Sequence, residues 1–112
     1  MIEKRRYDAE METISAKELE RYAREGRYLI IDLRSQADFR RKHVPGAVNV
    51  PRGNFRSELS GRNGETVVLY CERGAMSMAV ARNLERLGYR TKSVVGGFRA
   101  YCENVEAHRK NG

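Results

Sequence analysis

The sequence predicts an α/β fold in which a parallel sheet carries helices on both of its faces. Short apolar runs of strand length alternate along the chain with segments whose apolar residues recur at helical spacing. Short connections that contain Gly, Pro and Ser join these segments. The run Tyr28–Ile31 is apolar throughout, as expected for a strand that is buried on both faces. Because strands separated by helices pair in parallel, these observations favour one α/β domain.

Five segments have the length and composition of strands, and the clearest of them is 66–70. The five are residues 12–14, 28–31, 47–50, 66–70 and 91–95. Residues 1–11 alternate in charge and contain few apolar side chains, so we expect an N-terminal arm or an edge element there. We place the domain at residues 12–106 and expect a polar tail over residues 107–112.

Helices are predicted between these strands from capping residues and apolar spacing. Ser15 and Glu18 form an S-x-x-E capping box, and Gly26 is a natural stop for the helix that follows them. Three further helical segments are expected: 35–42 with Ser35 as its cap, one turn near 55–59, and a last helix over 98–105. A longer helix follows Cys71, and its apolar stripe is expected to lie in the core. That stripe consists of Met76, Val80, Leu84 and Leu87.

Composition and charge narrow the classes of protein. The chain has 112 residues and a net charge of +7 that is spread along the sequence, so we expect arginines that attract small anions rather than a nucleic-acid interface. No apolar run approaches the roughly 18 residues of a membrane span. The N-terminus lacks the apolar segment of a secretory signal. The two cysteines lack metal-ligand spacing, so we expect reduced thiols, no metal and a cytoplasmic protein.

Cys71 is the residue that most clearly points to chemistry. It lies where the predicted strand 66–70 passes through a short turn into a helix. The free N–H groups and positive dipole end of a helix N-terminus favour a thiolate, and cysteines placed in this way have lowered pKa values. Arg73 adds a positive charge nearby, and we expect Glu72 to point outward. The alternative is a buried, inert core cysteine.

The residues after Cys71 have the chemistry of an anion-binding cup. Gly74 allows the turn to curl so that successive amides point inward. Ala75 is small and leaves those amides accessible, and Ser77 can donate a hydroxyl hydrogen bond to the thiolate or to a bound anion. The pattern predicts a nucleophile at the base of a positively polarised hollow, without naming the reaction.

Four further polar sites carry weaker signals. Asp32 and Arg34 follow a strand end, and we expect an anchoring ion pair there, with bracing of the cysteine loop as the functional alternative. We expect His43 to be structural rather than a base for the thiol, because a thiol of low pKa needs none. Cys102 is predicted to be a half-buried helix residue, not a partner of Cys71 in a disulfide. His108 is expected to be solvated.

At three places the chain resembles the rhodanese-like single-domain sulfurtransferases. "IDLRSQADFRRKHVPGAVNVP" resembles that family's Asp-x-Arg segment and the Gly-His-Ile-Pro-Gly-Ala-x-Asn-Ile-Pro segment after it, with Lys42 in place of the glycine and Val44 in place of the isoleucine. "YCERGAMS" resembles the active-site loop. "GGFRAYCE" resembles a Gly-Gly-Phe-x-Ala-Trp segment, with Tyr101 in place of the tryptophan. The three segments occur in the family's order over most of residues 13–105.

The resemblance implies a roughly five-stranded parallel sheet and a reaction. Cys71 would accept a sulfane sulfur as a persulfide and pass it to an acceptor, with thiosulfate as donor and cyanide as acceptor in assays. Asp32 and Arg34 would support the site. The loop residues that would bind the anionic substrate are Glu72, Arg73, Gly74, Ala75, Met76 and Ser77. No cofactor is implied; a sulfur-acceptor protein is a further partner, and we expect a monomer that contacts neither membranes nor nucleic acid.

Two other functions on this fold stay open as alternatives. Phosphatases of the same fold, and with them arsenate reductases, are disfavoured because the phosphatases carry Cys-x5-Arg, and the arginine position counted from Cys71 is occupied by Ser77. For the sulfurtransferase function, the sixth loop position is occupied by Met76, whose side chain cannot bind an anion. Arg73 could supply the positive charge instead. The second alternative is a sulfur carrier or regulatory binding module without turnover of its own.

Overall fold

A computed structural model describes residues 11–51, 55–62 and 64–111 of the chain. The predicted N-terminal arm, except for Met11, lies outside the described residues. Within the described residues, no helix is long and apolar enough to span a bilayer.

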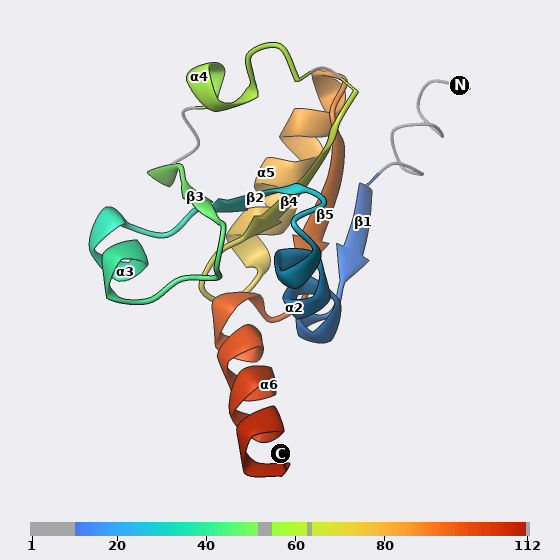
Figure 1. Cartoon of the computed structure of the whole chain (residues 1–112). Helices are drawn as coiled ribbons and strands as arrows, with labels where there is room; N and C mark the ends of the chain where they lie inside the picture. Colours follow the sequence, from blue (N-terminus) through green and yellow to red (C-terminus); the bar gives the residue numbers. More distant parts are fainter. Residues whose placement is uncertain (1–10, 52–54, 63, 112) are drawn as a thin grey trace.

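The centre of the molecule is a five-stranded sheet in which every neighbouring pair of strands is parallel. The strand order is β1-β5-β4-β2-β3, so β4 lies in the middle of the sheet (Figure 1). The strands are β1 (Met11–Ile14), β2 (Leu29–Asp32), β3 (Val48–Asn49), β4 (Thr66–Tyr70) and β5 (Arg90–Val94). The predicted α/β class and the parallel sheet are confirmed, and β4 has the predicted bounds.

Helices cover both faces of the sheet, and two apolar clusters fill the space beneath them. The helices are α2 (Ala16–Glu25), α3 (Gln36–Arg41), α4 (Arg56–Leu59), α5 (Ala75–Arg86) and α6 (Gly97–Asn111). Helices α2 and α6 contribute to one cluster, while α4 and α5 contribute to the other. Residues of β4 alternate between the clusters, with Tyr70 in the first and Cys71, the next residue, in the second.

The predicted capping residues begin the helices as expected. The Ser15 side chain accepts a hydrogen bond from the Glu18 main-chain N–H at 3.1 Å, and the Glu18 carboxylate accepts one from the Ser15 N–H at 3.1 Å. Gly26 ends α2 in the left-handed conformation with φ of 64°. Ser35 accepts a hydrogen bond from the Asp38 N–H and begins α3. Local polar chemistry therefore sets both helix starts.

The predicted core stripe of α5 is confirmed at Leu84 and wrong at Met76 and Leu87, because the buried side is turned by about one residue. Met76 and Leu87 are exposed, at 52% and 72% of their full areas, whereas Val80 is partly buried and Leu84 is buried. The residues that α5 buries are Ser77, Ala81, Leu84 and Glu85. The rotation has a polar cause: inward-facing hydroxyl and carboxylate groups of α5 bond to hydroxyl groups of β5, and these bonds fix the buried face.

The last helix is longer than predicted and projects away from the sheet (Figure 1). It runs through Asn111 instead of ending near Val105, because no Gly or Pro interrupts it before Gly112. Glu20 of α2 holds the added turns: its carboxylate accepts a hydrogen bond from Asn104 at 2.7 Å and lies 3.3 Å from the imidazole of His108. The side chain of His108 is half exposed, so it pairs with a carboxylate as well as meeting solvent.

Candidate functional site

Cys71 lies at the carboxyl end of the central strand, directly before the loop that leads into α5. Its sulfur accepts hydrogen bonds from the main-chain N–H of Gly74 at 3.1 Å and of Ser77 at 3.4 Å. The residue is 5% exposed, and both cysteines of the chain are free thiols. The structure therefore brings the thiol and inward-pointing amides together at one position.

Gly74 is the residue that permits this curl. Its φ is 111°, a conformation that side chains rarely adopt, and a Cβ there would lie 3.2 Å from the main-chain nitrogen of Gly96. The side chains of the loop face outward: Glu72, Arg73, Ala75 and Met76 are all exposed. The interior of the loop is thus lined by main-chain amides.

The loop makes the thiol more acidic than an ordinary cysteine. Burial alone would raise the pKa of Cys71. Hydrogen bonds from the Ser77 and Gly74 N–H groups, the Ser77 hydroxyl and the Arg73 N–H outweigh burial, so the pKa of Cys71 lies below its usual value. Arg73 thus contributes through its main chain. A thiolate in this position is a nucleophile that can attack an electrophilic sulfur.

Ser77 supports the cysteine loop from the interior of the protein. It is fully buried, and its hydroxyl donates to the Gly74 carbonyl at 3.0 Å and shares a hydrogen bond of 2.8 Å with the Ser93 hydroxyl. The sequence suggested that this hydroxyl donates to the thiolate or to a bound anion. The structure places it where it lowers the pKa of Cys71, and it also has partners inside the protein, Gly74 and Ser93. Sequence reasoning missed Ser93; its signal was a small polar residue in the otherwise apolar end of a strand.

Asp32 and Arg34 form a buried ion pair beside the cysteine loop. The Arg34 guanidinium lies 2.9 Å from the Asp32 carboxylate and donates to the Lys42 carbonyl at 2.6 Å. Its other terminal nitrogen lies 3.6 Å from the carboxylate of Glu72, and its carbon lies 3.9 Å from the centre of the Phe98 ring. Burial lowers the pKa of Arg34, but Asp32 outweighs it, and the net pKa is raised. The pair anchors the loop to the adjacent strand.

Tyr70 completes this network and was missed by the sequence analysis. Its hydroxyl donates to the Asp32 carboxylate at 2.6 Å and accepts a hydrogen bond from the Val44 N–H at 3.1 Å. Burial and the hydrogen bond to Asp32 raise the pKa of Tyr70, so the phenol stays protonated and keeps donating. The available signal was a tyrosine immediately before the cysteine at the end of a buried strand.

The N-terminus of α6 docks on the main chain of the loop. The Phe98 N–H donates to the Cys71 carbonyl at 2.8 Å, and the Arg99 N–H donates to the Glu72 carbonyl at 3.1 Å. A Cβ on Gly97 would lie 2.5 Å from the Cys71 carbonyl oxygen. Gly97 is therefore required by the close approach of two backbones, whereas a Cβ on Gly96 would meet the Ala100 side chain at 2.7 Å.

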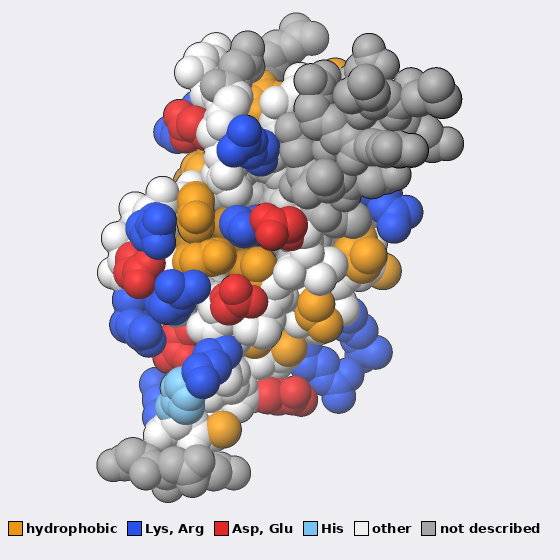
Figure 2. Space-filling model, turned by 90° about the vertical axis from the view of Figure 1, so that its right-hand side faces the viewer, with side chains coloured by type: hydrophobic (Ala, Val, Ile, Leu, Met, Phe, Trp, Pro, Cys, Tyr) orange, Lys and Arg blue, Asp and Glu red, His pale blue; other side chains and the backbone are white. Residues whose placement is uncertain are grey.

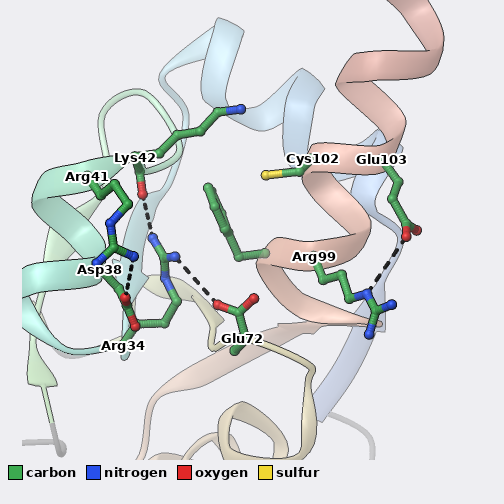
Figure 3. Close-up of a pocket in the computed structure, with 9 residues that line it drawn as sticks. Arg34, Asp38, Arg41, Lys42, Glu72, Arg99, Cys102 and Glu103 are labelled. Carbon is green, nitrogen blue, oxygen red and sulfur yellow. Dashed lines mark hydrogen bonds and ion pairs between the residues drawn. The ribbon is translucent and has the colours of Figure 1, made fainter.

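Cys102 and His43 do not join Cys71. Cys102 is half buried on α6, and its sulfur lines a separate groove of about 660 Å³ with Arg34, Lys42 and Glu72 (Figure 3). Burial raises the pKa of Cys102. The His43 imidazole stacks on Phe39 and bonds the Phe39 carbonyl at 2.7 Å, which is a structural role. Among the described residues, no cluster of His, Cys, Asp or Glu could hold a metal ion.

Charge on the surface is mixed. Lys and Arg side chains lie among Asp and Glu side chains on the face that Figure 2 shows, and they do not gather into one block there. Many arginines are matched by carboxylates within three or four residues along a helix, as Arg21 is by Glu25 and Arg41 by Asp38.

Comparison with known proteins agrees with this geometry. The model of the rhodanese-like domain family matches residues 15–104. A tRNA sulfurtransferase of Desulfurococcus amylolyticus is 33% identical over 75% of this chain and 17% of its own length. Thiosulfate sulfurtransferase 16 of Arabidopsis thaliana is 29% identical over 70% of this chain and 75% of its own length. The chain thus spans about a sixth of the first relative and most of the second.

A solved structure extends the likeness to three dimensions. The crystal structure of a rhodanese-like domain protein from Staphylococcus aureus superposes with a TM-score of 0.70 at 26% identity, covering 81% of this chain and 91% of that one. Both relatives are named as sulfurtransferases. The family match, the superposition and the amide-lined cysteine loop together show that this chain belongs to the rhodanese-like domain family.

Proposed function

We propose that this protein is a sulfurtransferase that moves a sulfane sulfur through a persulfide on Cys71. The observation that carries the proposal is the pair of main-chain N–H groups, from Gly74 and Ser77, aimed at the Cys71 sulfur. They stabilise negative charge on sulfur in the free thiolate. Rearranged around one more sulfur atom, the same loop can stabilise a persulfide anion and the charge on a departing group.

The reaction divides into two displacements. The Cys71 thiolate attacks the outer sulfur of a donor such as thiosulfate, a sulfur–sulfur bond forms, and the donor's own sulfur–sulfur bond breaks with its electron pair leaving on sulfite. An acceptor nucleophile, cyanide or a thiolate, then attacks the outer sulfur of the persulfide and regenerates the Cys71 thiolate. Neither step needs an external oxidant, reductant, metal or organic cofactor.

The loop is suited to a small anionic donor. Arg73 of the loop is exposed, and the net charge of +7 attracts anions from solution. We further propose that the protein works as a monomer in the cytoplasm, where its two free thiols stay reduced. Two acceptors of the sulfur are compatible with this reaction. One is an acidic acceptor protein, which the positive net charge would attract; the other is a tRNA-linked route, for which the first relative is named.

The phosphatase alternative is weaker on chemical grounds, whereas the sulfur-carrier alternative stays open. Ser77, which stands where the Cys-x5-Arg phosphatases have their arginine, is fully buried and bonded inside the protein, so the loop has no guanidinium fork for a phosphate. A sulfur carrier without turnover uses the same persulfide and differs only in releasing its sulfur to a dedicated partner and not to a small nucleophile.

Intact-mass measurement after thiosulfate treatment separates these functions. We expect an adduct of about 32 Da, one sulfur atom, that cyanide or dithiothreitol removes. Cys71→Ser should lose both the adduct and thiosulfate:cyanide turnover, while the matched variant Cys102→Ser keeps both. An adduct that cyanide cannot discharge would favour the carrier. Full turnover by Cys71→Ser would refute the proposal, and hydrolysis of an aryl phosphate without any adduct would favour a phosphatase.

A further inference from the structure

Helix α5 presents one whole side to solvent, and this side begins at the cysteine loop. The exposed residues of α5 and its C-cap recur at helical spacing, and we call them the α5 outer face. They are Ala75, Met76, Ala79, Arg82, Asn83, Arg86 and Leu87. The opposite side of the helix packs on the sheet through Ala81 and Leu84.

The outer face carries apolar side chains that the fold does not use. Met76 and Leu87, three turns apart along one edge of the helix, are 52% and 72% exposed. Val95 is the other large hydrophobic side chain that is exposed among the described residues, and it follows the strand end that packs against Gly74 of the cysteine loop. Met76 thus lies at the end of the outer face next to the loop, and Leu87 lies at the opposite end.

The charge of the outer face is positive, and within the part of the chain that the structure describes no carboxylate pairs with it. Arg82 and Arg86 are exposed one turn apart, and neither forms an ion pair with any described carboxylate. The single carboxylate of α5, Glu85, is turned inward, where it is 3% exposed and accepts a hydrogen bond from Thr91. On α2, by contrast, the arginines lie beside glutamates of the same helix. The outer face therefore attracts carboxylates from elsewhere.

We propose that the α5 outer face is the docking surface for a sulfur-acceptor protein that presents an acidic and partly apolar segment. This proposal rests on the proposed persulfide of Cys71. An acidic side chain pairs with Arg82 and Arg86, and an apolar one packs against Met76 and Leu87. A segment that lies along the helix reaches the cysteine loop at the N-terminal end of α5, where its thiol can meet the persulfide.

Two other occupants fit the face less well. A second copy of this chain would bring Arg82 and Arg86 against like charges and is repelled. A nucleic-acid backbone would pair with the arginines but offers phosphates and sugars, which are polar, to Met76 and Leu87. The combination of cationic and apolar side chains on one helix side favours the acidic protein segment.

The test separates docking from sulfur chemistry by using a synthetic amphipathic peptide of Leu and Glu with one terminal cysteine. Its matched controls are the same peptide with Lys for Glu, a thiol-free form with Ser for Cys, and an oligouridine. Binding of the thiol-free peptide is followed through the amide resonances of the isotope-labelled full chain. Transfer is followed as loss of the sulfur adduct from Cys71 and its gain by the thiol peptide.

We expect the acidic peptide, and not its Lys form, to shift the resonances of α5. The double variant R82E/R86E should slow transfer to the acidic peptide about tenfold at low salt, as loss of complementary interfacial charges does, with transfer to dithiothreitol unchanged. The control R40E/R109E makes the same charge change at exposed arginines of α3 and α6 and should leave the peptide rate near that of the parent.

Several results would overturn the docking surface. These are shifts confined to other elements, equal binding of the Lys peptide, a stronger response of α5 to oligouridine, or equal slowing by both double variants. If the acidic peptide binds α5 but no sulfur adduct ever forms on Cys71, the docking surface stands and the proposed function falls. The two proposals therefore fail separately.

Discussion

Gly97 offers the sharpest test of how the last helix holds the cysteine loop. Its φ is +63°, and a Cβ there would lie 2.5 Å from the Cys71 carbonyl oxygen and 2.7 Å from the carbonyl carbon and oxygen of Glu72. Contacts under 3.0 Å are not tolerated, and here both partners are backbone. In Gly97→Ala, the start of α6 and the loop must therefore separate.

The loss of folding stability in Gly97→Ala has two parts, and a matched variant separates them. An alanine in the left-handed conformation costs about 1–2 kcal/mol, and forcing a methyl group into a closely packed site adds about 1–3 kcal/mol. Gly26 has almost the same φ, +64°, and no atom lies within 4 Å of its Cβ position. Gly26→Ala thus bears only the first part, and any unfolded-state effect of replacing glycine is common to both variants.

Urea or thermal unfolding of the two variants measures the difference. Because 1 kcal/mol moves the midpoint of a domain of 60–100 residues by about 4–8 °C, Gly97→Ala should melt at least about 4 °C below Gly26→Ala. Separation of α6 from the loop also pulls the Phe98 N–H off the Cys71 carbonyl, so thiosulfate turnover should fall in Gly97→Ala at a temperature where both variants are folded. Equal melting and equal turnover would show that the loop does not depend on this contact.

Three further predictions follow from the network and the core. Alkylation of Cys71 by iodoacetamide should have its pH midpoint below that of the same thiol in urea-unfolded protein. The stability that the folded thiolate adds is fully present above the unfolded pKa and is lost as pH falls through the folded pKa. The free energy of unfolding of the parent, relative to that of Cys71→Ser, should therefore grow with pH. Tyr70→Phe removes a hydroxyl with two buried partners and should cost about 1–3 kcal/mol in urea unfolding, whereas Tyr101→Phe, whose hydroxyl makes no hydrogen bond to the described residues, should cost less. Leu84→Ala should lower the free energy of unfolding by about 2–5 kcal/mol, whereas Leu87→Ala should change it by no more than about 0.5 kcal/mol. Equal losses of stability would mean that Leu87 is buried, as the sequence predicted.

Local signals in the sequence were sufficient for most of the fold. The bounds of β4 follow from one apolar run, and the starts of α2 and α3 follow from Ser15 and Ser35, because a capping side chain acts on amides two or three residues away. The position of Cys71 at a strand end before a helix is local in the same sense. These features need no knowledge of distant contacts.

Features that depend on distant partners could not be predicted in this way. The buried side of α5 is set by Ser77 and Glu85, whose partners Ser93 and Thr91 lie on another strand. Apolar spacing alone placed the stripe about one residue away. The ion pair of Asp32 with Arg34 was expected, but the complete burial of Asp32 was not, because the groups that enclose it come from segments far apart in the sequence.

The alternation of Tyr70 and Cys71 has a consequence for how the protein can fail. The phenol belongs to the apolar cluster under α2 and α6, and the sulfur belongs to the cluster under α4 and α5. Both layers hold the loop that lowers the pKa of Cys71, because α5 supplies the Ser77 N–H to the sulfur and α6 supplies the Phe98 N–H to the Cys71 carbonyl. We therefore expect the thiolate to be lost when either layer melts. The charge on the Cys71 sulfur therefore reports whether the whole domain is folded. On heating, its loss should coincide with the loss of the helical circular-dichroism signal.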